Sequence, residues 1–218
     1  VEDRYVQASP GGRYLLYVQD DHYWTVDVTT RAVVNITKGA QTSFVDREPD
    51  FTIKQKPAFG VAGWTKNDQS VILYDKFDLW QVASDGSRAV RLTDGAAEQV
   101  RHRYIRLDPD EEWIELDKPA YLSLFGIWSK KTGYARLQPS ASGTANDEHL
   151  IWLDKSVQRL AKAKGADVYG YVIEAFDDSP DAFVGGPDLK EVKQITKTNP
   201  FQNNYAWGRA ELIEYKSE

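Results

Sequence analysis

Histidine is the first residue type to consider, because near neutral pH it serves both in acid–base catalysis and as a metal ligand. The chain has three histidines, His22, His102 and His149, which are far apart in the sequence. None lies in a spacing such as His-Glu-x-x-His, which places two ligands on one helix face. Because there is also no cysteine, the sequence predicts no metal site. His22 precedes a tryptophan-bearing segment, where we expect an ordinary polar turn residue.

Serine offers no recognisable nucleophile. A nucleophile elbow needs glycine two positions before and two positions after the serine, because the strand must turn sharply into a helix. No serine in the chain has a glycine two positions before it. The sequence therefore predicts no catalytic residue in these 218 positions.

Carboxylates are concentrated in residues 108–112, Asp-Pro-Asp-Glu-Glu. Such a run could bind a substrate amine or a cation, but Asp and Pro are turn formers and charge runs are usually solvated. We expect a hairpin turn between segments 104–107 and 113–116. Asp75, Asp78 and Asp85 do not have the spacing of a calcium-binding loop. No cofactor is expected, and no substrate-binding residue is identified.

The composition is that of a folded, mildly acidic protein. Of the 218 residues, 41% are hydrophobic and the formal net charge is −6, which excludes disorder for most of the chain and argues against nucleic acid as a partner. No apolar run is long enough to span a bilayer, and residues 1–4 have no signal-peptide pattern. The absence of methionine suggests a processed product or an internal piece of a longer chain.

The elements that would position any site are β-strands. Short segments rich in β-branched and aromatic residues alternate with turn residues, which favours an all-β fold with antiparallel hairpins. The clearest segments are residues 13–18, 22–28, 70–74, 121–125 and 168–173. Turns are expected at residues 9–12, 20–21, 84–87, 94–95, 177–180 and 185–187.

An internal repeat determines the predicted architecture. Trp24 and Trp80 are 56 positions apart, and so are Thr37 and Thr93 and the glycines two positions after them. A later unit ends at residues 192–197, and a weaker one is expected to close at residues 134–137. About four units of a turn, a strand, a tryptophan-bearing strand and a strand ending in Leu/Ile-Thr describe β-propeller blades. A β-sandwich is the alternative fold.

One region departs from the repeat. In residues 148–165, the apolar residues Leu153, Val157 and Leu160 could share a helical face, so a short helix and an irregular outer strand are both compatible with the sequence. Residues 138–147 and 46–57 are expected to be loops.

The blade motifs resemble a known protein family. Residues 9–17, 61–65 and 74–80, and more specifically residues 176–181, 194–196, 199–200 and 207–217, are similar to the N-terminal β-propeller of serine peptidases of the prolyl oligopeptidase family. The resemblance implies the C-terminal part of a larger seven- or eight-bladed ring, with blades in residues 1–204 and a linker strand in 205–218. That strand would lead into an α/β-hydrolase domain absent from this chain. Glu111 and Glu112 are the only adjacent glutamate pair, but their context does not match the family's amine-binding motif.

The resemblance also implies a function. The chain would gate and position peptide substrates for the α/β-hydrolase domain of the same parent, a dipeptidyl- or acylaminoacyl-peptidase-like enzyme, and would be inactive alone because the triad lies in that domain. The alternative is a stand-alone TolB-like propeller module that binds protein partners. Exposed blade edges would favour homo-oligomers. The family suggests a periplasmic or secreted location, and a cytoplasmic one is also compatible.

Overall fold

The protein is built from four antiparallel β-sheets. The computed structural model describes residues 6–50, 52–54, 56–139, 147–208 and 211–216. The first sheet contains β1 (Gln7–Ala8), β2 (Tyr14–Gln19), β3 (His22–Asp27) and β4 (Val33–Asn35). The second contains β5 (Val61–Trp64), β6 (Ser70–Tyr74), β7 (Leu79–Ala83) and β8 (Ala89–Arg91).

The third sheet contains β9 (Val100–Tyr104), β10 (Ala120–Gly126), β11 (Thr132–Leu137) and β12 (Asp147–Leu153). The fourth contains β13 (Ser156–Lys162), β14 (Tyr169–Ala175), β15 (Asp178–Gly185) and β16 (Lys193–Gln194). Two short 3₁₀ turns, η1 (Lys66–Asp68) and η2 (Pro200–Asn204), are the helical elements of the described residues, and neither could cross a membrane.

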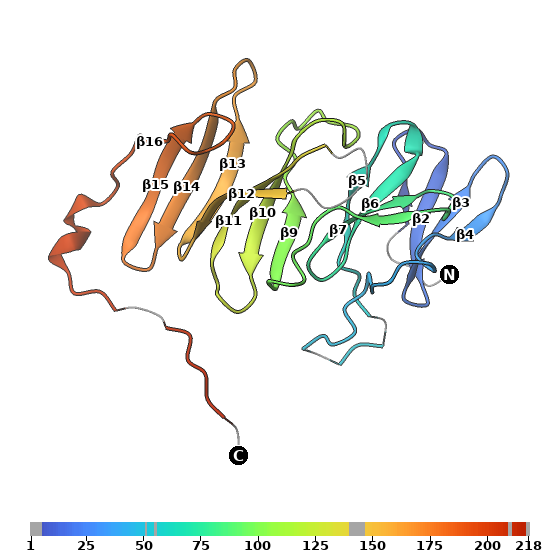
Figure 1. Ribbon diagram of the computed structural model, residues 1–218, viewed down its shortest axis with the longest axis horizontal. Helices are drawn as coiled ribbons and strands as arrows, with labels where there is room; N and C mark the ends of the chain where they lie inside the picture. Colours follow the sequence, from blue (N-terminus) through green and yellow to red (C-terminus); the bar gives the residue numbers. More distant parts are fainter. Residues whose placement is uncertain (1–5, 51, 55, 140–146, 209–210, 217–218) are drawn as a thin grey trace.

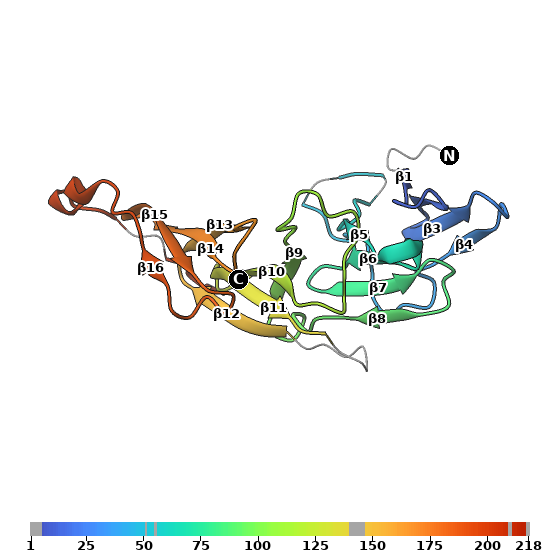
Figure 2. The same cartoon turned by 90° about the horizontal axis from the view of Figure 1, so that it is seen from above.

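Each sheet is a meander in which neighbouring strands in the sequence are also hydrogen-bonded neighbours. The four sheets follow one another in a row along the molecule (Figures 1 and 2), and the segment after β16 runs away from the last sheet. The predicted all-β fold of about four four-stranded blades is therefore confirmed. Whether the row belongs to a ring of seven or eight blades stays a prediction.

Three apolar clusters hold the row together, one between each pair of neighbouring sheets. Leu16 and Val71 belong to the cluster of sheets one and two, and Ile72 and Leu122 to that of sheets two and three. Tyr134 packs between sheets three and four and is 2% exposed. A single sheet cannot bury both of its faces, so each blade is stabilised by covering its neighbour.

The sequence repeat corresponds to a shared hydrogen-bond pattern. In three blades, a threonine follows the fourth strand. Its hydroxyl oxygen accepts a hydrogen bond from a backbone N–H of the third strand. The same hydroxyl contacts the side chain of the residue fifteen positions earlier. The pairs are His22 with Thr37, Asp78 with Thr93, and Asp181 with Thr196. We call this contact the threonine clamp. It fixes the outer strand to the third strand, which explains why these threonines recur in one register.

The threonine clamp of the second blade gives a direct stability prediction. Thr93 is fully buried, accepts the N–H of Leu79 at 3.1 Å and donates to Asp78 Oδ1 at 2.8 Å. The Thr93→Val substitution removes the hydroxyl that pairs with the N–H of Leu79 and with Asp78 Oδ1. It should lower the free energy of unfolding by about 2 kcal/mol. Urea denaturation measures the change. Thr29→Val, at an exposed hydroxyl with no partner in the described residues, is the control and should change stability by less than about 0.5 kcal/mol; equal effects of the two substitutions would contradict the clamp.

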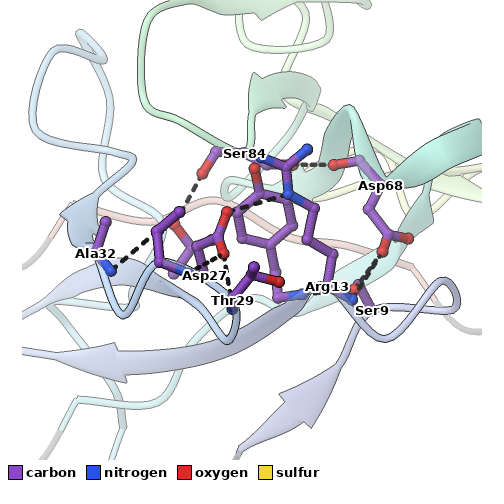
Figure 3. A network of polar contacts seen from close by, with 10 residues as sticks. Ser9, Arg13, Asp27, Thr29, Ala32, Asp68 and Ser84 are labelled. Carbon is purple, nitrogen blue, oxygen red and sulfur yellow. Dashed lines mark hydrogen bonds and ion pairs between the residues drawn. The ribbon is translucent and has the colours of Figure 1, made fainter.

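A polar joint fixes the first blade to the second (Figure 3). The carboxylate of Asp68 accepts the hydroxyl of Ser9 at 2.6 Å and the backbone N–H groups of Gly11 and Arg13 at 3.0 and 3.3 Å. Asp68 is 3% exposed and adopts a φ of 56°. A Cβ atom on Gly11 would lie 2.7 Å from Asp68 Oδ2, so a larger residue would displace this carboxylate. The turn at the start of the first blade is therefore held by one buried carboxylate of the second.

The third blade differs from the prediction. Residues 134–137 belong to β11, the third strand, and not to the closing strand, which is β12. Most of the expected loop at residues 138–147, namely 140–146, lies outside the described residues, as do positions 51 and 55 of the loop at 46–57. The predicted hairpin between 104–107 and 113–116 is also wrong: Ile114 bridges to Thr65 of the second blade in parallel.

The ambiguous segment 148–165 forms strands β12 and β13, and no part of it is helical. Val157 and Leu160 are both buried although they are three positions apart. The cause is a bulge in β13: the pairing with β14 shifts between Gln158 and Ala161, and Arg159, which lies between them, has a φ of 63°. An extra residue in one strand shifts the alternation of its side chains. The helix-like spacing is therefore the signature of a β-bulge.

Candidate functional site

The acidic residues singled out in the sequence are structural. Asp75 accepts the N–H groups of Phe77 and Asp78 and the indole N–H of Trp80. The run at 108–112 contains a turn, as expected, and Glu111 accepts the hydroxyl of Tyr104. These partners occupy the carboxylates of Asp75 and Glu111. The structure does not bring Asp75, Asp78 and Asp85 together as a calcium loop would require.

Two of the three histidines meet in the third blade. His102 Nε2 lies 3.2 Å from Asp147 Oδ2, and one ligand atom each from His102, Asp147 and His149 lies within 4.8 Å of the others. His102 is 2% exposed, Asp147 is half-buried and His149 is exposed. We call these three residues the histidine cluster. It is the one group of at least three potential ligands found among the described residues.

Strand geometry explains how the histidine cluster forms. Asp147 and His149 are two positions apart on β12, so their side chains point to the same face of the sheet. The strand pairing across the third blade places His102 of β9 on that face as well. The cluster therefore needs both the alternation along β12 and the register across four strands.

The ring of His102 is held from two directions. Its Nδ1 lies 3.0 Å from the carbonyl oxygen of Val100, which can only accept a hydrogen bond. A Cβ atom on Gly95 would lie 2.4 Å from Nδ1 and 2.0 Å from the Val100 oxygen, so only glycine leaves room for this arrangement. Nδ1 therefore carries a proton, and Nε2 is the atom that faces Asp147.

Two carboxyl groups at the cluster have shifted pKa values. Burial alone would raise the pKa of Asp147, but the contact with His102 and the charge of His149 hold it below the ordinary value of an aspartate. Asp78 is fully buried; burial raises its pKa, while the N–H of Gly95 and the nearby charge of His102 oppose this shift. Its Oδ2 has no hydrogen-bond partner in the described part of the chain. The guanidinium of Arg103 donates to the backbone carbonyls of His102 and Asp75.

His22, the third histidine, lies outside the cluster. It is the first residue of β3 and not the turn residue that was predicted, but its role is structural. Its Nδ1 lies 3.1 Å from the hydroxyl of Thr37. Asp78 and Asp181 occupy the same place in the other two threonine clamps. The contact of His22 with Thr37 therefore stabilises the fold of the first blade.

A separate cleft of about 550 Å³ lies on the last blade. Leu153, Ile173 and Phe183 form apolar parts of its lining, and Lys155 and Asp178 form an ion pair of 3.2 Å beside them. The cleft combines an apolar surface with polar groups, as binding sites do, but the described residues that line it include no histidine.

Comparisons with known proteins concern the fold. No family model and no curated protein match the chain. A solved structure of oligogalacturonate lyase in complex with manganese has a TM-score of 0.54 at 11% identity, over 87% of this chain and 51% of the lyase. The fold is that of a β-propeller. A TolB structure from Acinetobacter baumannii has a TM-score of 0.43 at 13% identity, over 90% of this chain and 44% of TolB. A puromycin hydrolase structure has a TM-score of 0.46 at 13% identity, over 91% of this chain and 30% of the hydrolase.

The propeller therefore spans about half of the lyase and TolB chains and less than a third of the hydrolase. The histidine cluster was missed in the sequence because its members come from strands separated by about 45 positions. The one local signal is Asp147-x-His149, and it becomes meaningful only once β12 is recognised as a strand.

Proposed function

We propose that the propeller is a non-catalytic part of a larger serine peptidase that resembles the prolyl oligopeptidase family, of the dipeptidyl- or acylaminoacyl-peptidase type. Its blades would form a wall of the chamber in which an α/β-hydrolase domain of the same parent cleaves peptides. Selectivity for short peptides would then follow from the geometry of the chamber, because a folded protein cannot pass the wall.

The exposed apolar segment after the last blade carries this proposal. Six large apolar side chains between residues 201 and 215 are half or more exposed: Phe201, Tyr205, Trp207, Leu212, Ile213 and Tyr215. The indole of Trp207 donates to the carbonyl of Gln202 at 2.8 Å, and its ring meets Phe176 edge-on. Large exposed apolar side chains gathered in one segment indicate an interaction site. Residues 205–218, predicted as the linker strand, contain five of these six side chains, and no regular strand is assigned in their described part.

The histidine cluster does not have the arrangement of a Ser-His-Asp triad. In a Ser-His-Asp triad, the histidine Nδ1–H donates to the aspartate and Nε2 faces the serine. Here Nδ1 of His102 faces a backbone carbonyl, and Nε2 faces Asp147. His102 is therefore oriented wrongly for general-base catalysis on a serine.

The experiment has two parts. The coding region around this chain is read for a Gly-x-Ser-x-Gly elbow followed by Asp and His, and the whole encoded protein is then treated with a fluorophosphonate probe that labels active serines. We expect labelling of the parent protein and none of the 218-residue chain. Peptide substrates of increasing length should show a cut-off in the parent protein.

Labelling of the 218-residue chain alone would overturn the proposal. A coding region without a hydrolase domain would do the same and would favour the TolB-like binding module. Gel filtration separates the two interpretations further, because the exposed segment 201–215 predicts self-association when no partner domain covers it.

A further inference from the structure

We propose that the histidine cluster binds one divalent transition metal ion, with zinc as the ion that its donors fit best. The ligand atoms would be Nε2 of His102, a carboxylate oxygen of Asp147 and one ring nitrogen of His149. This inference is independent of the proposed function, since it concerns one face of the third blade and not the segment after the last one.

The first argument is the orientation of His102. With its Nδ1 proton directed to the carbonyl of Val100, a neutral His102 has a lone pair on Nε2. This lone pair faces Asp147 Oδ2 at 3.2 Å, and two acceptors at that distance repel each other. A proton or a metal ion held between the two atoms removes this repulsion.

The second argument is the presence of His149. A proton shared by His102 and Asp147 needs only those two residues, whereas a metal ion needs further donors. His149 supplies a third donor within 4.8 Å of both. Two ligands on one tetrahedral zinc ion are about 3.3 Å apart, given zinc–nitrogen and zinc–oxygen bonds of about 2.0–2.1 Å. The observed 3.2 Å between His102 and Asp147 fits this geometry.

The third argument is the support behind the ligands. Metal-binding histidines generally donate their other ring N–H to a carbonyl or carboxylate, which fixes the ring. Val100 provides such a carbonyl, and the missing side chain of Gly95 allows the ring to approach it. Because His149 is exposed, an ion can enter from its side of the cluster.

The donors select the class of ion. Two imidazole nitrogens and one carboxylate oxygen suit zinc and its neighbours in the first transition row, whereas magnesium and calcium prefer oxygen ligands. Three protein ligands leave a fourth position for water or a ligand. A bound ion would also connect β9 to β12, the two edge strands of the blade.

The test is calorimetric titration of tag-free, chelator-treated protein with Zn²⁺ and, separately, with Mg²⁺. We expect one bound Zn²⁺ per chain and no measurable Mg²⁺ binding. The variants His149→Gln and Asp147→Asn should each bind Zn²⁺ at least about 100-fold more weakly, since loss of an outer-shell partner alone costs 10- to 100-fold. His22→Gln is the matched control and should bind like the wild type.

A second measurement reports on the ligands themselves. Co²⁺ in place of Zn²⁺ should give visible absorption bands of a low-symmetry site, and these bands should disappear in His149→Gln. This substitution is at an exposed side chain, so circular dichroism should show an intact fold. Absence of Zn²⁺ binding to the wild type would overturn the proposal, and so would equal binding by the wild type and both ligand variants.

Discussion

The Asp68→Ala substitution should lower the free energy of unfolding by about 3 kcal/mol. The carboxylate of Asp68 accepts hydrogen bonds from Ser9, Gly11 and Arg13, all of which belong to the first blade. Hydrogen bonds to a charged group contribute about 1.5–3 kcal/mol each, and removing the acceptor leaves buried donors unpaired. The loss exceeds that of an ordinary surface substitution because one side chain fixes the whole turn.

The measurement is equilibrium urea denaturation, read from tryptophan fluorescence. Asp177→Ala is the matched control, because Asp177 is exposed and has no hydrogen bond or ion pair in the described residues; it should change stability by less than about 0.5 kcal/mol. Asp68→Asn should lie between the two, since an amide keeps one acceptor oxygen. If Asp68→Ala were as stable as Asp177→Ala, the joint between the first two blades would have to reside elsewhere.

Gly133→Ala is expected to have a comparable effect by a different cause. Gly133 lies on β11, and a Cβ atom at this position would lie 1.8 Å from the carbonyl oxygen of Ile151 on β12. A backbone atom cannot rotate away as a side chain can, so β12 must move from β11. Overpacking of this kind costs typically 1–3 kcal/mol and sometimes more; we expect about 3 kcal/mol.

Gly170→Ala is the control for this prediction. Gly170 lies within β14, and a Cβ atom there would meet the oxygen of Phe183 at 3.7 Å, an ordinary contact. Neither glycine has a positive φ, so the two substitutions differ in the room available for the new methyl group and not in backbone strain. Thermal unfolding followed by circular dichroism compares them. A destabilised Gly170→Ala together with an unchanged Gly133→Ala would show that the close approach of β11 and β12 is not a constraint.

Much of the fold could be predicted because the residues that recur in the repeat each have a structural role in their blade. Trp24 and Trp80 have the same place in the strand pairing, opposite Asn35 and Arg91. The threonines of the first, second and fourth blades recur because each completes a clamp. The Leu/Ile-Thr pair marks the end of the fourth strand in each of these blades. The other strands could therefore be located between this pair and the turn that begins the blade.

The third blade was harder to predict because it lacks that landmark. Its closing strand β12 follows a long connection, and the sequence offered Tyr134 and Leu137 of β11 as a plausible end. Pro180 shows a related difficulty: it was assigned to a turn, but it lies within β15 beside an irregularity in the pairing with β14, where proline is tolerated. The histidine cluster depends on the register of this third blade, so it could not be found before the blade itself was resolved.

The arrangement of the three apolar clusters has a consequence for how the molecule opens. Each cluster joins sheets that are neighbours in the row. The stability of one sheet therefore depends directly only on the sheets next to it. The two inner sheets have covers on both sides, whereas the outer two have one each. Amide protons of β6 and β10 should therefore exchange with solvent most slowly, and those of β2 and β14 should exchange through partial openings that leave the centre intact.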